Sequence, residues 1–540
     1  MAISFTDCSI PSSLQNLNAA KTPLRLPLAR PRGRRWGHGP LATAVLVVAT
    51  LIVATSAWLS LVSSGTTAPC WHRRSSLIFQ TTTAADSAAA APTPLPSSLP
   101  GLPSRNALLS DENRGGSEDQ LTLEHLVFGI AGSSQLWERR KEFLRLWWRP
   151  NEMRGHVWLD EQVAAETDDS LPPFMISEDA SRFRYTNPTG HPSGLRISRI
   201  VSESFRLGLP NVRWFVLCDD DTIFNPHNLV AVLSKYDSSE MVYIGGPSES
   251  HSANSYFSHS MAYGGGGIAI SRPLAEALSN ILDDCIDRYQ GFYGSDDRLH
   301  ACITELGVPL SREHGFHQWD IRGNARGLLS AHPIAPFVSI HHVEAVEPFY
   351  PGLTTLESLR LFTKAMSIDP MSFLQRSICY DHTRHLSFAV SLGYAVQVFP
   401  TIVLPRVLER SEKTYSAWNG ISKRDEFDVD TRDPYRSLCK KPIFFFLKDA
   451  AKQDNNGTTL GSYGRGWVNE GLKRRVFCFF HSRPLPNVAD IEVVGHPLRK
   501  NWHLVPRRLC CRVNHTTSQH LTITVAECDK GSSGAFTDST

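Results

Sequence analysis

Short apolar runs alternate with longer amphipathic stretches between residues 119 and 365. Apolar runs bounded by polar turn residues are typical of buried strands, and they occupy 125–130, 157–159, 214–218, 241–244 and 268–271. The amphipathic stretches repeat apolar residues at helical spacing and predict helices at 136–147, 195–207, 273–287 and 299–306. This alternation favours an α/β fold with a mostly parallel, Rossmann-like sheet flanked by helices.

The pattern changes after residue 365. Stretches rich in β-forming residues follow one another without long amphipathic helices between them, at 387–398, 441–447, 475–480 and 521–525. We therefore interpret 366–530 as a mostly β accessory region and 531–540 as a flexible tail. We expect the domain at 119–365 to carry the chemistry.

Residues 41–62 contain no charged side chain and are numerous enough to cross a bilayer as a helix. Within 1–40 lie six basic residues and one acid, so the positive-inside rule predicts a type II signal anchor with a cytosolic basic tail. A cleaved signal peptide, a transit peptide and a core helix are the alternatives. Residues 63–118, rich in Ser, Thr, Ala and Pro, indicate a low-complexity stem.

The net charge of +2 argues against nucleic acid as a partner. Ten of the 11 cysteines follow the predicted span and form no Cys-x-x-Cys pair, so disulfides in an oxidising lumen are favoured over zinc. The expected pairings are Cys285 with Cys302, and Cys510 and Cys511 with partners that include Cys478 and Cys528, whereas Cys218 is expected to be a buried free thiol.

Three consecutive carboxylates, Asp219, Asp220 and Asp221, follow the apolar run at 214–218. In an open α/β sheet, ligands bind just beyond the carboxyl ends of the strands. Adjacent carboxylates there repel one another unless a cation neutralises them, and hard oxygen ligands suit Mg²⁺ or Mn²⁺. A solvated acidic turn that caps the next helix is the alternative.

A second acidic pair, Asp296 and Asp297, opens the predicted helix about 75 residues later, and a run of four glycines at 264–267 lies between the two acidic centres. Two acidic centres suit sugar transfer, because one can hold a metal while the other accepts a proton from the attacking hydroxyl. Glycines let backbone approach a ligand closely. Helix capping explains the acidic pair equally well, and a flexible bend explains the glycines.

Taken together, these segments resemble the Fringe-like β1,3-glycosyltransferases, and most closely their plant branch. The resemblance covers roughly residues 120–350. Its pieces are Arg196–Ile200, Trp214–Thr222, the glycine run continuing to Ala269, Gly294–Asp297, Leu306–Leu310, Gly315–His317 and Val338–His342, and Pro434–Cys439 in the accessory region also looks like the plant branch.

The resemblance implies a GT-A fold, a UDP-sugar donor, a divalent metal (Mn²⁺ or Mg²⁺) and inversion at the anomeric carbon. It assigns Asp219 and Asp221 to the metal, with His341 as the third ligand and His342 and His317 as rivals. Asp297 matches the catalytic base, with Asp296 as the fallback. The implied donor-binding residues are Asp219, Asp220, Asp221, Arg196, Gly266 and Gly267. This chain departs from Fringe at Trp319, where Fringe has a histidine.

We therefore predict a Golgi membrane glycosyltransferase that moves a sugar from a UDP-sugar to a hydroxyl of a glycan or glycoside, with a β1,3 linkage by family analogy. A catalytically inert lumenal protein that binds a glycan or partner on the same fold is the main alternative. A metal-dependent phosphohydrolase is a weaker one, because it commonly needs a second metal. The transferred sugar depends on the shape of the pocket, which motifs do not reveal.

Overall fold

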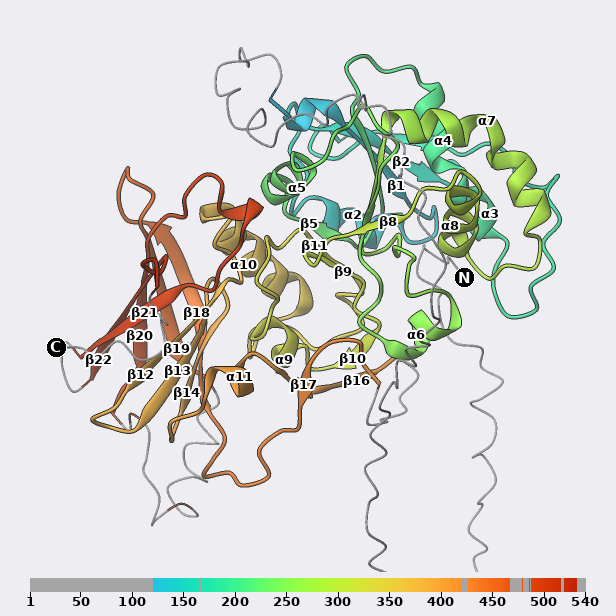
Figure 1. Cartoon of the computed structure of the whole chain (residues 1–540). Coiled ribbons are helices and arrows are strands. Elements are labelled where there is room, and N and C mark those ends of the chain that lie inside the picture. The colour runs from blue at the N-terminus through green and yellow to red at the C-terminus, as the bar shows by residue number, and fades with distance from the viewer. Residues whose placement is uncertain are drawn as a thin grey trace, which may run out of the picture. The chain divides into compact units, whose positions relative to one another are not determined.

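The computed structural model describes residues 120–164, 168–418, 426–466, 478, 485, 487–515 and 519–531. All of them belong to one compact unit of the chain (Figure 1). The predicted basic tail at 1–40, span at 41–62 and stem at 63–118 lie outside the described residues. So does nearly all of the strand predicted at 475–480.

A seven-stranded sheet forms the centre of the region between residues 120 and 312. Its strand order is β3 (Phe174–Ile176), β2 (Arg154–Leu159), β1 (Leu126–Ala131), β4 (Trp214–Asp219), β7 (Ile268–Ser271), β6 (Tyr243–Gly245) and β8 (Leu310–Arg312). All neighbouring pairs are parallel except those that β7 makes with β4 and β6. The carboxyl ends of β1, β2 and β4 therefore meet at one edge.

Helices cover both faces of this sheet. Successive side chains of a strand point to opposite faces, and here both sets are apolar and buried. On β1, Phe128 belongs to one hydrophobic core and Val127 to the other. The first core includes side chains of α2 (Trp137–Leu144) and α5 (Pro226–Leu233), and the second those of α3 (Ser193–Ser198), α4 (Ile200–Arg206), α7 (Arg272–Arg288) and α8 (Ser295–Glu305). The single helix predicted at 195–207 is instead two helices, α3 and α4, which meet at Arg199.

Two small sheets follow the central one. The three-stranded sheet joins β5 (Ile223–Phe224), β11 (Ser339–Ile340) and β9 (Phe316–His317), and the two-stranded sheet joins β10 (Ile321–Gly323) and β16 (Tyr415–Ala417). The short helices nearby are α6 (His251–Tyr256) and α9 (Arg326–Leu329). Because β16 comes from the accessory region, its pairing with β10 ties that region to the chain around the candidate site.

The accessory region contains an eight-stranded sheet. Its order is β12 (Arg376–Asp381), β13 (Leu386–Ser391), β14 (Ala395–Phe399), β18 (Ile443–Lys452), β19 (Thr459–Arg465), β20 (Asp490–Gly495), β22 (His520–Ala526) and β21 (Cys510–His515). The edge strands β12 and β21 lie side by side, joined by a disulfide between Cys379 and Cys511. Helix α10 (Thr355–Ile368) packs against β18, and the remaining short elements are α11 (Pro405–Leu408), β15 (Ser411–Glu412) and β17 (Thr431–Arg432).

The predicted fold class is wrong in its sheet. The mostly parallel Rossmann-like sheet is a mixed sheet, because β7 runs antiparallel to both of its neighbours. The chain enters β7 at the carboxyl end of β4 and runs back along it, and just before β7 the Gly265 carbonyl accepts a hydrogen bond from Thr222 at 2.8 Å. None of the helices in the described part of the chain is long and apolar enough to cross a membrane, and the predicted span at 41–62 lies outside that part.

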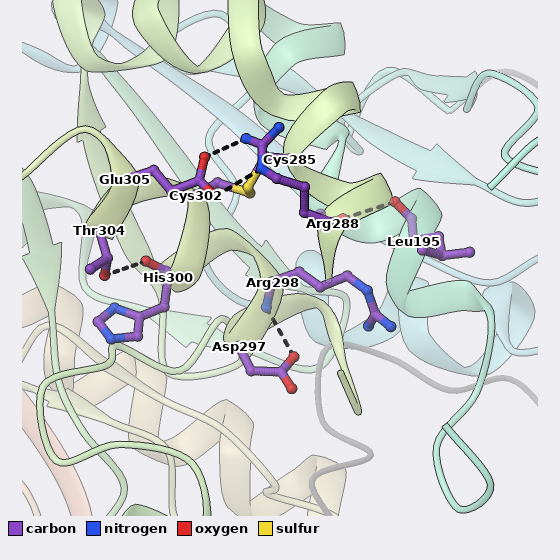
Figure 2. The surroundings of a disulfide bond; sticks show 10 residues. Leu195, Cys285, Arg288, Asp297, Arg298, His300, Cys302, Thr304 and Glu305 are labelled. Atoms are coloured by element: carbon purple, nitrogen blue, oxygen red, sulfur yellow. Dashed lines mark hydrogen bonds and ion pairs between the residues drawn. A yellow bond between two sulfur atoms is a disulfide. The ribbon is translucent and has the colours of Figure 1, made fainter. Parts of the chain in front are cut away.

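Four disulfides join described cysteines, and the predicted pair Cys285–Cys302 is confirmed. Cys510 pairs with Cys528, as one of the expected alternatives. Cys478 pairs instead with Cys439, and Cys218 is a buried free thiol as predicted. The Cys285–Cys302 bond joins α7 to α8, and an ion pair between Arg288 and Glu305 joins the same two helices (Figure 2).

We expect the double substitution Cys285→Ala, Cys302→Ala to lower the free energy of unfolding by about 3 kcal/mol, because the bond closes a loop of 17 residues in the unfolded chain. Urea denaturation of the full chain would measure this loss. The single change Cys218→Ala is the control for removing a cysteine that closes no loop. A double variant no less stable than Cys218→Ala would contradict the prediction.

Candidate active site

The three aspartates lie in the turn that ends β4, and all are buried. The backbone N–H of Asp220 donates to the Ala131 carbonyl at the end of β1. The Asp219 N–H donates to the Thr222 hydroxyl at 3.1 Å. Backbone contacts therefore hold the turn closed and keep three carboxylates within a few residues of the sheet edge. Such a turn is not the solvated acidic loop of the alternative interpretation.

His341 follows directly after β11 and meets these carboxylates. Its Nε2 lies 3.1 Å from Asp221 Oδ1 and 3.4 Å from Asp219 Oδ2. Ligand atoms of the three side chains all lie within 4.8 Å of one another, and all three side chains are buried. Strand β11 pairs with β5, which begins just after the acidic turn. This short pairing accounts for the meeting of residues 120 positions apart in the sequence.

Arg140 on α2 supplies a second cationic partner. Its Nη1 lies 2.7 Å from Asp221 Oδ2 and 3.1 Å from Asp220 Oδ1, and its Nε lies 3.1 Å from Glu344. A buried carboxylate is stable as an anion only when it is paired or neutralised. Arg140 and His341 together provide this for the acidic turn.

The pKa values follow from burial and from these pairs. Burial raises the pKa of Asp220 to about 8, against the opposing charge of Arg140. Burial also acts to raise the pKa of Asp221, but the charges of His341 and Arg140 overcome it and hold that pKa below its usual range. For His341, burial lowers the pKa while Asp221 and Asp219 raise it, to about 10.

The donor set of this cluster fits a divalent cation. Two carboxylates and one imidazole suit Mn²⁺ or Mg²⁺ better than a thiolate-binding ion. The buried atoms Asp221 Oδ1 and His341 Nε2 face each other without a hydrogen bond to the rest of the described protein. A cation between them would meet all three side chains at once. The structure thus brings together the three residues predicted to hold a metal.

The two rival histidines have partners other than Asp219 and Asp221. His317 is buried beside Glu249, 2.8 Å from its carboxylate, and beside His332 at 3.0 Å. The ring of His342 lies against that of His341, with centroids 4.0 Å apart and the planes tilted by 35°, and it stacks on Trp418 at 4.2 Å. The His342 Nδ1 lies 3.3 Å from Asp320. His342 therefore supports the ring of His341 instead of sharing its contacts with the aspartates.

The glycine run joins the acidic turn to the strand that carries His341. Gly266 donates its N–H to the Gln318 side chain at 2.8 Å and accepts from the Ser339 hydroxyl. Gly267 has a φ of +98°, and a Cβ there would meet the Phe224 ring at 2.8 Å. A residue with a side chain is excluded at that position by both strain and contact. The predicted contact of these glycines with a donor remains a prediction.

The second acidic pair opens α8 as expected. Asp297 is half-buried, and its carboxylate accepts hydrogen bonds from the backbone N–H groups of Tyr293, Gly294 and Arg298 at 2.8–3.0 Å. Burial raises the pKa of Asp297 despite the nearby charge of Arg298. Figure 2 shows Asp297 at the start of the helix that the disulfide ties to α7. Asp297 therefore does cap the start of α8, as the alternative interpretation expects. Its carboxylate is nevertheless partly exposed to solvent.

Asp296 faces inward from the same turn and is only 1% exposed. Burial raises its pKa well above the usual range, and the negative charge of Asp219 adds to the effect. The Ser295 hydroxyl donates to Asp296 Oδ1 at 3.2 Å. The backbone of Gly264 hydrogen-bonds Asp296, and the next residue, Gly265, accepts from Thr222 directly after the acidic turn, so the start of α8 lies near that turn.

Arg196 is partly buried at the same edge of the sheet. Its guanidinium donates to the carbonyls of Gly132 and Trp158 at 3.0 and 2.9 Å, and to the Ser177 hydroxyl at 3.2 Å. These acceptors lie at the ends of β1, β2 and β3. The described contacts of Arg196 hold the strand ends together, and its predicted contact with a diphosphate stays a prediction.

Comparisons with known proteins match parts of the chain. A family model described as "Protein of unknown function, DUF604" matches residues 253–511, which include α8, His341 and much of the accessory region. The β-1,3-glucosyltransferase of Mus musculus is 34% identical over 110 residues, 20% of this chain and 21% of the relative. The β-1,3-glucosyltransferase of Homo sapiens is 34% identical over 108 residues, 19% of this chain and 20% of the relative.

This chain therefore matches about a fifth of the length of the curated relatives. These relatives are glycosyltransferases by name, the class of enzyme that the sequence predicts. The narrower resemblance to the plant branch of Fringe-like enzymes stays a prediction.

Three residues of the site were missed in the sequence: Arg140, Glu344 and Trp418. Arg140 belongs to an ordinary charged stretch, Trp137–Lys141, and Trp418 lies far away in the accessory region. No local pattern distinguishes either from a surface residue. The proximity of Glu344 to His341 in the sequence was the one available signal.

We expect Arg140→Met to lower the free energy of unfolding by about 3 kcal/mol, because it leaves Asp220 and Asp221 without their shared cation in a buried setting. Chemical denaturation at neutral pH would measure the loss. Arg139→Met is the matched control: Arg139 is the preceding residue, is 61% exposed and pairs only weakly with Glu344, so its loss should stay within about 0.5 kcal/mol. Equal losses in the two variants would contradict the prediction.

Proposed function

We propose that this protein is a metal-dependent glycosyltransferase that moves a sugar from a UDP-sugar to a hydroxyl of a glycan or glycoside, with inversion and a β1,3 linkage. The observation that carries the proposal is the meeting of Asp219, Asp221 and His341 at the sheet edge. The similarity to β-1,3-glucosyltransferases supports the class of reaction and makes UDP-glucose the first donor to test.

The acidic turn would hold the donor through a divalent cation. Asp219, Asp221 and His341 would be its protein ligands, and Arg140 keeps the remaining oxygen of Asp221 oriented at 2.7 Å. A bound Mn²⁺ or Mg²⁺ would neutralise the negative charge that develops on the departing diphosphate. Asp220, which Arg140 contacts at 3.1 Å, would be the residue of the turn that meets the donor's ribose or sugar.

Asp297 is the better placed of the two candidates for the general base. Its carboxylate is oriented by three backbone N–H groups and remains partly exposed, so an acceptor hydroxyl can reach it. Its raised pKa increases its affinity for the proton it must accept. Asp296 is buried, and its pKa is raised far enough to favour the protonated form. A protonated carboxyl cannot accept the proton of an acceptor, so we assign Asp296 a supporting role.

An oxidising compartment suits the described part of the protein. Four disulfides join its cysteines, and such bonds persist in the secretory pathway and outside the cell. UDP-sugar transfer to glycans takes place in the same pathway. We therefore propose the Golgi lumen as the site of action.

Release of UDP by the purified full chain tests this function directly. We expect one donor of a UDP-sugar panel, supplied with Mn²⁺ and a glycan or glycoside acceptor, to be consumed. EDTA and Asp221→Ala should abolish UDP release, and Asp297→Asn should lower kcat by roughly 10²- to 10⁴-fold because the variant loses its base. Asp284→Asn, an exposed acid on α7, is the matched control and should retain activity.

The pattern of results separates the alternatives. Asp297→Asn that retains full activity while Asp296→Asn loses it would move the base to Asp296. UDP release that does not depend on an acceptor, with no sugar product other than the free sugar, would indicate hydrolysis. Folded protein that binds a glycan without turnover of any donor would support the inert binding protein and contradict the proposal.

Binding of Mn²⁺ at the acidic turn should release about one proton. His341 has a pKa of about 10 without metal, so it is protonated at neutral pH and must become neutral before it can bind a cation. The apparent affinity should therefore rise with pH, about tenfold per unit below that pKa. Calorimetric titration in two buffers with different ionisation enthalpies would count the protons. Binding that releases none would contradict the assignment of His341 as a ligand.

A further inference from the structure

A second cluster of metal-binding side chains lies outside the candidate active site. His251 begins α6, His259 follows that helix, and Asp428 comes from the accessory region. Asp428 Oδ1 lies 2.6 Å from His251 Nδ1, and Asp428 Oδ2 lies 3.3 Å from His259 Nδ1. Ligand atoms of the three side chains all lie within 4.8 Å of one another. We propose that this cluster is a site for a zinc-class transition-metal ion that joins the two segments.

The backbone holds the two segments together without help from the side chains. The His251 N–H donates to the Glu426 carbonyl at 2.8 Å, and the Asp428 N–H donates to the Glu249 carbonyl at 3.0 Å. Ser250 and Phe427 form a β-bridge between these bonds. The Asp428 carboxylate is thus presented to His251 by rigid backbone, which lowers the entropic cost of assembling a metal site.

Further hydrogen bonds orient the ligands. Asn254 donates to Asp428 Oδ2 at 2.8 Å, so it fixes the plane of the carboxylate. The Ser255 hydroxyl lies 3.2 Å from His251 Nε2. A hydrogen bond there directs the other ring nitrogen, Nδ1, toward Asp428, as supporting groups do for metal-bound histidines. The ring of Phe257 packs against Tyr263 and Tyr293, which anchors the chain that leads to His259.

The ligand types select the ion. Two imidazoles and one carboxylate suit Zn²⁺ and similar ions, whereas Mg²⁺ and Ca²⁺ prefer oxygen ligands alone. Tetrahedral zinc with bonds near 2.0–2.1 Å places its ligand atoms about 3.3 Å apart. The distance from His259 Nδ1 to Asp428 Oδ2 already has this value, whereas the distance of 2.6 Å from His251 Nδ1 to Asp428 Oδ1 would have to widen. Small shifts of the side chains are therefore needed for one ion to meet all three. The side chains of His251 and His259 are 47% and 57% exposed, which leaves space for water as a further ligand.

The metal would act as a clamp beside the candidate active site. Glu249, two residues before His251, hydrogen-bonds the Trp319 N–H at 2.7 Å. Ser248 donates to Asp320 at 2.6 Å, and Asp320 in turn contacts His342, the ring that supports His341. A metal at the second cluster would therefore hold the accessory region against the segment that supports the ligand of the first.

Binding of Co²⁺, a coloured substitute for Zn²⁺, tests the proposal on the full chain after chelator treatment and with Mg²⁺ in excess. We expect His259→Ala to bind one equivalent fewer than the wild type and to lose the corresponding visible absorption. His259 is the ligand of choice because its side chain is largely exposed, so its removal should not unfold the chain. His385→Ala, an exposed histidine of the accessory region, is the matched control and should bind as the wild type does.

The same pair of variants in an Asp221→Ala background separates the second cluster from the acidic turn, since the loss of one equivalent should persist there. In this Asp221→Ala background, Zn²⁺ should also raise the Tm of the parent and of the His385→Ala variant but not that of the His259→Ala variant. Equal Co²⁺ uptake by wild type and His259→Ala would overturn the proposal and leave a hydrogen-bonded His–Asp–His cluster.

X-ray absorption of the Co²⁺-loaded Asp221→Ala chain needs no histidine variant. Two imidazole ligands are expected, and a spectrum with oxygen ligands alone would also overturn it.

Discussion

Three adjacent carboxylates are buried at the end of one strand, and their mutual repulsion is the constraint on which the rest of the site depends. Asp219, Asp220 and Asp221 cannot all remain anionic in this setting without nearby positive charge. Arg140 reaches them from α2, and His341 reaches them from the end of β11. The placement of both elements against the turn therefore has an electrostatic reason in addition to hydrophobic packing. The same excess of negative charge makes the turn suited to a divalent cation.

The glycine run at 264–267 contacts both the end of the acidic turn and the strand that precedes His341. Thr222 binds Gly265 next to the acidic turn, and Ser339 binds Gly266 two residues before His341. The glycine run is thus hydrogen-bonded both to the residue that follows the carboxylates and to the strand that precedes the imidazole. The same run leads into β7, which pairs antiparallel with β4 and makes the sheet mixed.

The accessory region takes part in the site and is not a separate appendage. Trp418 stacks on His342, and β16 pairs with β10 directly after the segment that contains Gln318 and Asp320. Because a histidine ligand depends on the groups that orient its ring, residues of this region influence the geometry at His341. This arrangement gives a physical reason for one family model to match across both regions.

The sequence by itself determined the local features: most strands and helices of residues 120–312, the β character of the accessory region, the acidic turn after β4 and the acidic start of α8. Strong periodicity and short-range signals specify such features. Only the tertiary structure decided the direction of β7, the contacts of His341 with Asp219 and Asp221, and the presence of Arg140 and Trp418 at the site. Each of these depends on which residues approach across long stretches of chain, and contacts of that range leave no periodic trace in a single sequence.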